Sequence, residues 1–233
     1  MTPKKTFWAV VLMLGFALSQ PIQVKAQQET DCPKRIGALG ENFLSTHAIK
    51  VIKDVYQKLG CTLQVLLFPG RRSFVQFNSG AVDGELYRLP IGTINYTRPY
   101  VASEVPLFTI TNSLWEAPAI TNESAASIGY TMGVSWQKIF LDTHQIPGIA
   151  YRNGTDLIND YHKGHVTRFL AEDSNVRASI AAGMFKDNNI PIRKEVIKTG
   201  ELSHYLGAEF TPFMKRFSAY LIAHKPFAQF DSQ

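Results

Sequence analysis

The chain has 233 residues, of which 45% are hydrophobic and 18% are charged, and its formal net charge is +5. Residues 1–26 hold three lysines and no acidic residue, so the net charge of the remaining 207 residues is only +2. That part contains no basic run, which argues against nucleic acid as a partner. Its length suffices for one large domain or two smaller lobes with a substantial core.

The first residues are typical of a secretory signal peptide. Lys4 and Lys5 precede an apolar run at 7–18, and Val24-Lys25-Ala26 leads into polar residues. The run has twelve residues, whereas a membrane-spanning helix needs roughly 20. We therefore expect cleavage near Ala26 and a soluble, periplasmic mature protein. An uncleaved membrane anchor is the alternative.

The beginning of the mature chain predicts a strand, helix, strand unit. A short strand at 34–40 is followed by a helix at 45–60, whose apolar residues recur at i, i+3, i+4 and i+7. Ser45 is the expected N-cap of this helix and Gly60 its stop. A β-rich run at 61–68 follows. Such a unit implies parallel strands with a right-handed crossover.

Cys32 and Cys61 are the two cysteines of the chain, and both lie in the exported part. Cys32 precedes the first predicted strand and Cys61 opens the second, so neighbouring parallel strands would bring both to the same end of a sheet. Export favours oxidation, and a bridge would close a loop of about 30 residues. Two unpaired thiols remain the alternative, because a disulfide needs Cα atoms about 4.4–6.8 Å apart.

The next segments extend the first unit. We expect a short helix at 71–78, a strand at 81–86, an irregular stretch at 87–104 and a strand at 105–112, followed by a loop with Pro118.

From residue 127 strands and helices alternate again, which suggests a second α/β lobe. We expect strands at 127–133, 148–153 and 165–173, helices at 135–144, 155–164 and 174–185, extended chain at 191–206 and a closing helix at 209–224. The aromatic residues of the closing helix are expected to form core.

Ser135 directly follows a predicted strand and opens a predicted helix. This position suits an N-cap, an anion site formed by free backbone N–H groups, or the nucleophile of a serine hydrolase-like enzyme. Gln137 stands where the hydrolase motif G-x-S-x-G requires its second glycine. Hydrolysis is therefore the weakest of the three interpretations.

No cofactor or metal site is predicted. The stretch that contains Asp83 and Glu85 lacks the further oxygen ligands of a calcium loop. His162 and His165 lack a third ligand in a recognisable relation to them, and Gly164 interrupts their helix.

Three arginines, Arg71, Arg72 and Arg88, follow predicted strand ends. Ligands of open α/β sheets bind at the carboxyl ends of strands, and a planar guanidinium group suits a carboxylate. These arginines are candidate ligand anchors, with solvated surface arginines as the alternative.

The string KVIKDVYQKLGCTLQVLLFPGRRSFVQFNSGAVDGELYR resembles the first lobe of the family 3 extracellular solute-binding proteins, which have the type II periplasmic binding fold. SIGYTMGVSW and TDLINDYHKGHVTRFLAED resemble their second lobe, and LSHYLGAEFTPFMKRFSAYL resembles the return into the first. The resemblance implies an α/β fold of two lobes, each a mainly parallel sheet flanked by helices. A two-strand hinge near 105–112 and 200–207 would join them.

In this interpretation lobe 1 comprises 27–111 and 200–233, and lobe 2 comprises 112–199. The resemblance implies a monomeric protein that performs no chemistry and captures a small polar, carboxylate-bearing, amino acid-like solute for an ABC-type transporter. A ligand sensor for a membrane receptor is the alternative, and a hydrolase that uses Ser135 is a weaker one.

The implied solute pocket lies between the lobes. It would be formed by Glu41, Asn42, Phe43, Arg71, Arg72, Tyr87, Arg88, Ser135, Trp136 and Asp173. Amino acid-binding members carry a Ser/Thr-rich pattern with an arginine that binds the α-carboxylate. Here Arg98, beside Pro99, matches that pattern only loosely, so Arg88 is the expected substitute anchor.

Overall fold

The computed structural model describes residues 31–40, 42–69, 71–118 and 127–230, so the predicted signal peptide and its cleavage site near Ala26 lie outside the described residues. The described chain has an α/β architecture. Its strands form a mixed sheet in the order β2-β1-β3-β9-β5-β8-β6-β7, with β4 paired to β9. No helix in these ranges combines the length and the apolar character that a membrane crossing needs.

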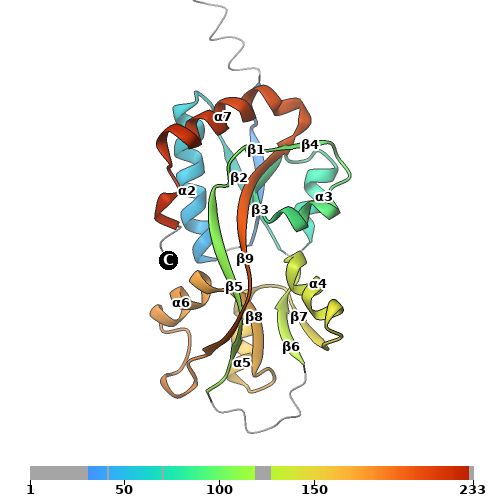
Figure 1. The fold of residues 1–233 in the computed structure, drawn as a ribbon, viewed down its shortest axis with the longest axis vertical. Coiled ribbons are helices and arrows are strands. Elements are labelled where there is room, and N and C mark those ends of the chain that lie inside the picture. The colour runs from blue at the N-terminus through green and yellow to red at the C-terminus, as the bar shows by residue number, and fades with distance from the viewer. Residues whose placement is uncertain (1–30, 41, 70, 119–126, 231–233) are drawn as a thin grey trace, which may run out of the picture.

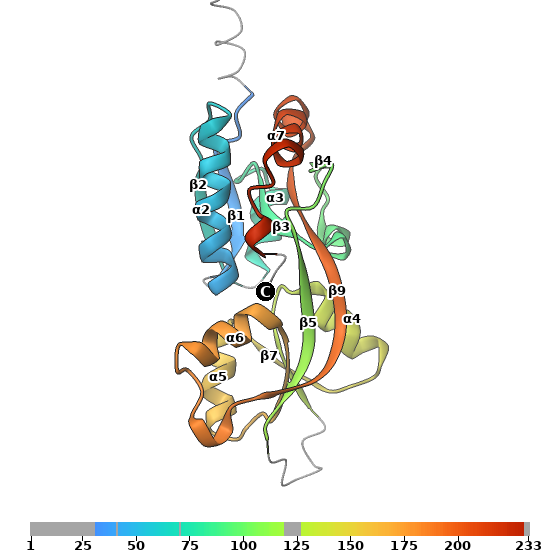
Figure 2. The same cartoon turned by 60° about the vertical axis from the view of Figure 1, so that its left-hand side comes forward.

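Two long antiparallel strands, β5 (Phe108–Glu116) and β9 (Ile192–Gly207), are paired along the whole of β5. Figure 1 shows the other elements gathered in an upper and a lower part around these two strands, and Figure 2 shows the same division after rotation.

The upper part contains the predicted strand, helix, strand unit. Its elements are β1 (Arg35–Leu39), α2 (Phe43–Lys58), β2 (Gln64–Phe68), α3 (Arg72–Asn78), β3 (Gly84–Arg88), the 3-10 helix η1 (Pro90–Asn95), β4 (Tyr100–Ala102), the 3-10 helix η3 (Ala208–Phe210), α7 (Thr211–His224) and the 3-10 helix η4 (Ala228–Phe230). Strand β1 is parallel to β2 and to β3. The predicted parallel unit is therefore confirmed.

The lower part repeats the alternation of strand and helix. Its elements are β6 (Ile128–Thr131), α4 (Ser135–Thr143), β7 (Gly148–Tyr151), α5 (Gly154–His162), β8 (Arg168–Glu172), α6 (Asp173–Ala181) and the 3-10 helix η2 (Asp187–Asn189). Strand β6 is parallel to β7 and to β8, and β8 is antiparallel to β5.

Two predicted N-caps are wrong, although α4 begins at Ser135 as predicted. Asn42, not Ser45, caps α2, because its Oδ1 accepts the backbone N–H of Ser45 at 2.8 Å while the Ser45 hydroxyl is buried against Tyr87. Val134, not Ser135, is the N-cap of α4. Both serines therefore lie within the first residues of their helices, where their hydroxyl groups are used in other contacts.

Strand β5 begins later and ends later than the predicted strand at 105–112. Pro106 has no N–H to donate to a neighbouring strand, and the strand begins at Phe108. It continues through Leu114 and Trp115 to Glu116, because these residues pair with β8 on one side and with β9 on the other.

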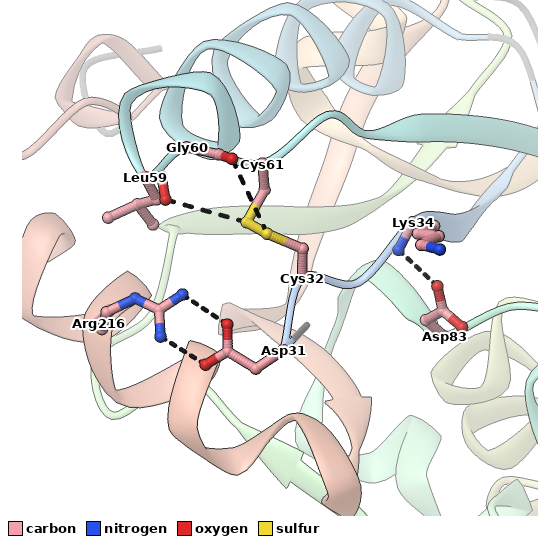
Figure 3. Close-up of a disulfide and its surroundings, with 8 residues drawn as sticks. All are labelled: Asp31, Cys32, Lys34, Leu59, Gly60, Cys61, Asp83 and Arg216. Atoms are coloured by element: carbon pink, nitrogen blue, oxygen red, sulfur yellow. Dashed lines mark hydrogen bonds and ion pairs between the residues drawn. A yellow bond between two sulfur atoms is a disulfide. The ribbon is translucent and has the colours of Figure 1, made fainter. Parts of the chain in front are cut away.

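Cys32 and Cys61 form a disulfide, with their Cα atoms 5.6 Å apart (Figure 3). This settles the two alternatives that the sequence left open. Figure 3 also shows a bidentate ion pair between Asp31 and Arg216 of α7, with N–O distances of 2.5 and 2.9 Å. The entry to β1 is thus attached covalently to the start of the β2 segment and electrostatically to α7.

His204 on β9 is buried in the interior of the upper part, with an exposed fraction of 0%. Its Nδ1 donates to the carbonyl of Glu85 at 2.8 Å, and its Nε2 accepts from the Tyr56 hydroxyl at 2.8 Å. This assignment satisfies both ring nitrogens in the neutral form, because a carbonyl only accepts. Burial lowers the pKa of His204 to about 4.

We expect an NMR titration to find His204 neutral down to a midpoint near pH 4. In the unfolded chain the same imidazole titrates near pH 6.5. The unfolded state therefore binds a proton first, and the His204 contribution to stability is lost as the pH falls from about 6.5 toward 4. A His204 midpoint near 6.5 in the folded protein would contradict the burial of this side chain.

Candidate functional site

A cavity of about 120 Å³, here called the central cavity, lies between the upper and lower parts. Strand ends surround it: Leu39 ends β1, Arg88 ends β3, Gly133 follows β6 and Glu172 ends β8. The polar side chains in its wall are Asn42, Tyr87, Arg88, Asn112, Ser135, Glu172 and Asn175. The rest of the wall is mostly apolar, including the buried Trp136.

A wider cleft of about 730 Å³ adjoins the central cavity. The two spaces share wall residues from both parts of the molecule, namely Leu39, Asn42, Asn112, Val134, Glu172 and Asn175. Phe43 lines only the wider cleft, opposite α5 and α6.

Three hydrogen bonds cross from the upper to the lower part beside the central cavity. They join the Leu44 N–H to Asn175 Oδ1 at 3.2 Å, Arg88 Nη1 to the Gly133 carbonyl at 3.3 Å, and Asn95 Nδ2 to Ser135 Oγ at 3.1 Å. The two parts are therefore in direct polar contact around the cavity.

Arg88 is the cation of the cavity wall within the described residues, and its charge is matched by a buried carboxylate. Its Nε and Nη2 donate to Glu85, the second at 3.1 Å, and its guanidinium carbon lies 4.3 Å from the Phe74 ring centroid. Glu85 is 1% exposed and also accepts from the Tyr96 hydroxyl at 2.8 Å and from Ser73. Burial by itself lowers the pKa of Arg88, but the Glu85 carboxylate outweighs this effect and holds that pKa above its ordinary value.

The Glu85–Arg88 pair depends on an irregularity of the backbone. Side chains three positions apart on a regular strand point to opposite faces. The register of β3 against β9 shifts between Glu85 and Arg88, as in a β-bulge, and a bulge redirects a side chain. Glu85 and Gly133 occupy three of the five guanidinium N–H donors, which leaves two for another partner.

Glu172 lies at the junction of β8 and α6 and lines both the central cavity and the wider cleft. Its carboxylate accepts the backbone N–H groups of Ser174 and Asn175, each at 2.9 Å, and the Ser174 hydroxyl at 2.6 Å. Burial raises the pKa of Glu172, although these hydrogen bonds oppose the rise. Within the described ranges no cation forms an ion pair with it.

Asp173, the acid that the sequence predicted for the pocket, lines neither space. It is 1% exposed and pairs with Arg193 at 2.9 Å and with Arg177 at 3.8 Å. The two consecutive acids were both visible in the sequence. Which of them faces the cavity is decided by the residue at which α6 begins.

Tyr87 lines the central cavity and also packs against residues in the interior of the upper part. Its hydroxyl lies 2.9 Å from Ser45 Oγ, and its ring packs edge-on against Phe108 at 5.7 Å. Burial raises the pKa of Tyr87 to about 12; the Glu172 charge adds to the rise and the Arg88 charge opposes it.

The structure brings together Asn42, Tyr87, Arg88, Ser135 and Trp136 at the central cavity. Arg71 and Arg72 are exposed at the start of α3 and line neither space. Glu41 lies outside the described residues.

Arg98 takes part in a structural network away from the cavity. It pairs with Glu209 and donates to the carbonyls of Phe77 at 3.2 Å and Val82 at 2.9 Å. The loose motif match at this position therefore does not supply a cavity cation.

No family model and no curated protein matches the chain. Several solved structures do. Holo ArgBP from T. maritima superposes with a TM-score of 0.67 at 11% identity, covering 87% of this chain and 93% of that one. AbpA of Streptococcus pneumoniae, an amino acid ABC transporter substrate-binding protein bound to L-arginine, gives 0.65 at 13% identity, with 89% and 95% covered.

The GluR0 ligand-binding core from Nostoc punctiforme, in complex with L-glutamate, gives a TM-score of 0.64 at 8% identity, with 84% of this chain and 96% of that one covered. At such low identities the likeness establishes a shared fold and leaves the ligand of this chain open.

Proposed function

We propose that this chain, which has the type II periplasmic binding fold of the structures it resembles, is an exported, monomeric solute-binding protein. In this proposal the upper and lower parts are two lobes that close on a small polar solute in the central cavity. The protein performs no chemistry and delivers the solute to an ABC-type transporter in the membrane.

The observation that carries this proposal is the position of the central cavity. It lies where the carboxyl ends of β1, β3, β6 and β8 meet between the two parts. Open α/β sheets bind their ligands outside the carboxyl ends of the strands. A small cavity with apolar walls and a few convergent polar groups is also the usual form of a small-molecule site.

Strands β5 and β9 are the proposed hinge, because they are shared by both parts. Lobe 1 would then comprise 27–111 and 200–233, and lobe 2 would comprise 112–199. Hinge opening around such strands would break the three hydrogen bonds that cross beside the cavity. The described conformation corresponds to the closed state in this proposal.

A carboxylate is the solute group that we assign to Arg88. Two guanidinium N–H donors of Arg88 remain, and Arg88 and Ser135 both line the cavity. The amino acids named for AbpA and GluR0 carry such a group, so an amino acid-like solute is the first choice.

The two alternative functions receive different support. The GluR0 ligand-binding core shares this fold, so a sensor that acts on a membrane receptor is a second candidate. The hydrolase interpretation is not supported by the contacts of the described residues: the Ser135 hydroxyl accepts a hydrogen bond from the Asn95 amide, which cannot take its proton. Crosslinking in cells separates importer from sensor by the membrane partner that is recovered.

We expect an amino acid-like carboxylate to raise the melting temperature of the purified protein, and Ser135→Phe to abolish that shift by filling the cavity. A ligand at 100 times its Kd adds about 2.7 kcal/mol to the stability of the folded state. Lys138→Ala is the matched control, because Lys138 lies on the same helix but its side chain is 56% exposed. No shift with any solute of a broad library, or an undiminished shift in Ser135→Phe, would refute the proposal.

A further inference from the structure

We propose that the central cavity selects solutes that carry a net positive charge, because Glu85 balances the charge of Arg88 and Glu172 has no counter-ion among the described residues. This inference rests on the proposed solute-binding function and adds the charge class of the solute.

Within the described part of the chain, three charged side chains determine the net charge of the cavity. Arg88 and Glu172 are the charged side chains of the wall, and Glu85 lies directly behind Arg88. Together they carry one negative charge. The net charge of the whole chain, +5, has the opposite sign, so the cavity is a local exception to the overall balance.

Arg88 acts as a neutral donor group, since Glu85 neutralises it. A carboxylate that approaches the two remaining N–H groups gains hydrogen bonds, but it also meets the Glu85 carboxylate held in the same buried pair. The attraction by Arg88 is reduced by the repulsion from Glu85, because the site screens charges weakly. Arg88 therefore orients a carboxylate and attracts anions less than an arginine without a paired carboxylate would.

Glu172 is the group that attracts a positively charged solute. Its neighbour Asp173 is paired with two arginines, whereas the partners of Glu172 in the described part of the chain are the hydrogen-bond donors Ser174 and Asn175. These bonds favour the ionised carboxylate and fix its position, but they supply no full positive charge. Glu172 and Tyr87 both line the central cavity, so the charge of Glu172 lies in the cavity wall.

A solute with one ammonium or guanidinium group more than it has carboxylates would restore neutrality. Its carboxylate would meet Arg88 and its excess cation would face Glu172. With a solute of net charge zero, the cavity keeps one uncompensated negative charge. An anionic solute increases that negative charge.

Three amino acids of similar length and different net charge test this inference by titration calorimetry. They are L-lysine at +1, L-norleucine at 0 and L-2-aminoadipate at −1. We expect L-lysine to bind at least about tenfold more tightly than L-norleucine, and L-2-aminoadipate to bind most weakly. In Glu172→Gln the preference for lysine over norleucine is expected to fall to about threefold or less, because Gln keeps an acceptor oxygen for Ser174 but no charge.

Asp142→Asn is the control, since Asp142 is an acid whose side chain is 61% exposed on α4 and it pairs with Lys138 outside the cavity. It should keep the lysine preference. Equal affinities across the series, or tightest binding of L-2-aminoadipate, would overturn the net-charge inference and leave the solute-binding function standing. An absence of binding by all three, together with no shift in the broad library, would overturn both. The comparison of the three solutes on the unmodified protein decides the matter even if Glu172→Gln does not fold.

Discussion

Replacement of either partner of the Glu85–Arg88 pair is expected to lower the free energy of unfolding by about 3–5 kcal/mol. Both side chains are buried, so removing one leaves the other as an uncompensated charge in the core. Glu85→Gln would leave the Arg88 guanidinium without its carboxylate. Arg88→Met would leave the Glu85 carboxylate with hydrogen bonds from Ser73 and Tyr96 and with no cation among its described partners. Urea unfolding of the two variants measures the loss.

The double variant Glu85→Gln/Arg88→Met separates the pair from its surroundings. It contains no stranded charge, so its loss of stability should be clearly smaller than the sum of the two single losses. The matched control is the exposed pair Lys138–Asp142, for which Lys138→Met should change stability by about 0.5 kcal/mol or less. Strictly additive losses in the Glu85 and Arg88 variants would contradict a mutually compensated pair.

The sequence predicts the fold well because the local signals for it are redundant. In α2, apolar spacing, a polar cap and Gly60 all indicate the same helix, and Gly60 has the positive φ of 81° that a helix stop requires. The resemblance to type II periplasmic binding proteins is confirmed at the level of the fold by the solved structures. The choice between Asn42 and Ser45 as cap depended on a distant residue, Tyr87, which no local pattern reveals.

The candidate site was predicted less completely, for reasons of geometry. Arg88 could be placed at a strand end, but the bulge that turns Glu85 toward it comes from the pairing of β3 with β9, more than a hundred residues away in sequence. Glu172 and Asp173 were indistinguishable until the start of α6 was known. Arg71 and Arg72 share the strand-end pattern of Arg88 and yet point to solvent, since that pattern does not specify the direction of a side chain.

The double variant Cys32→Ser/Cys61→Ser is expected to lose on the order of 3–4 kcal/mol in its free energy of unfolding. The disulfide closes a segment with a sequence separation of 29 residues that contains β1 and α2. Without it the unfolded chain regains the conformations that the cross-link forbids, while the folded chain keeps most of its contacts. Urea unfolding under oxidising conditions measures the difference, and the unmodified protein in excess reductant should reproduce it.

Arg216→Gln tests whether this stabilisation comes from the cross-link or from local anchoring of the same strand end. Arg216 binds Asp31, next to Cys32, so it fastens the entry of β1 to α7 without closing a covalent loop (Figure 3). Its side chain is one-third exposed, and such a pair contributes about 1 kcal/mol or less. If the stability comes from the cross-link, Arg216→Gln lowers the free energy of unfolding only slightly. The decrease in the cysteine variant is then at least about twofold larger. Equal losses would mean that the folded state is stabilised by holding this strand end in place, and the loop-closure account of the disulfide would be wrong.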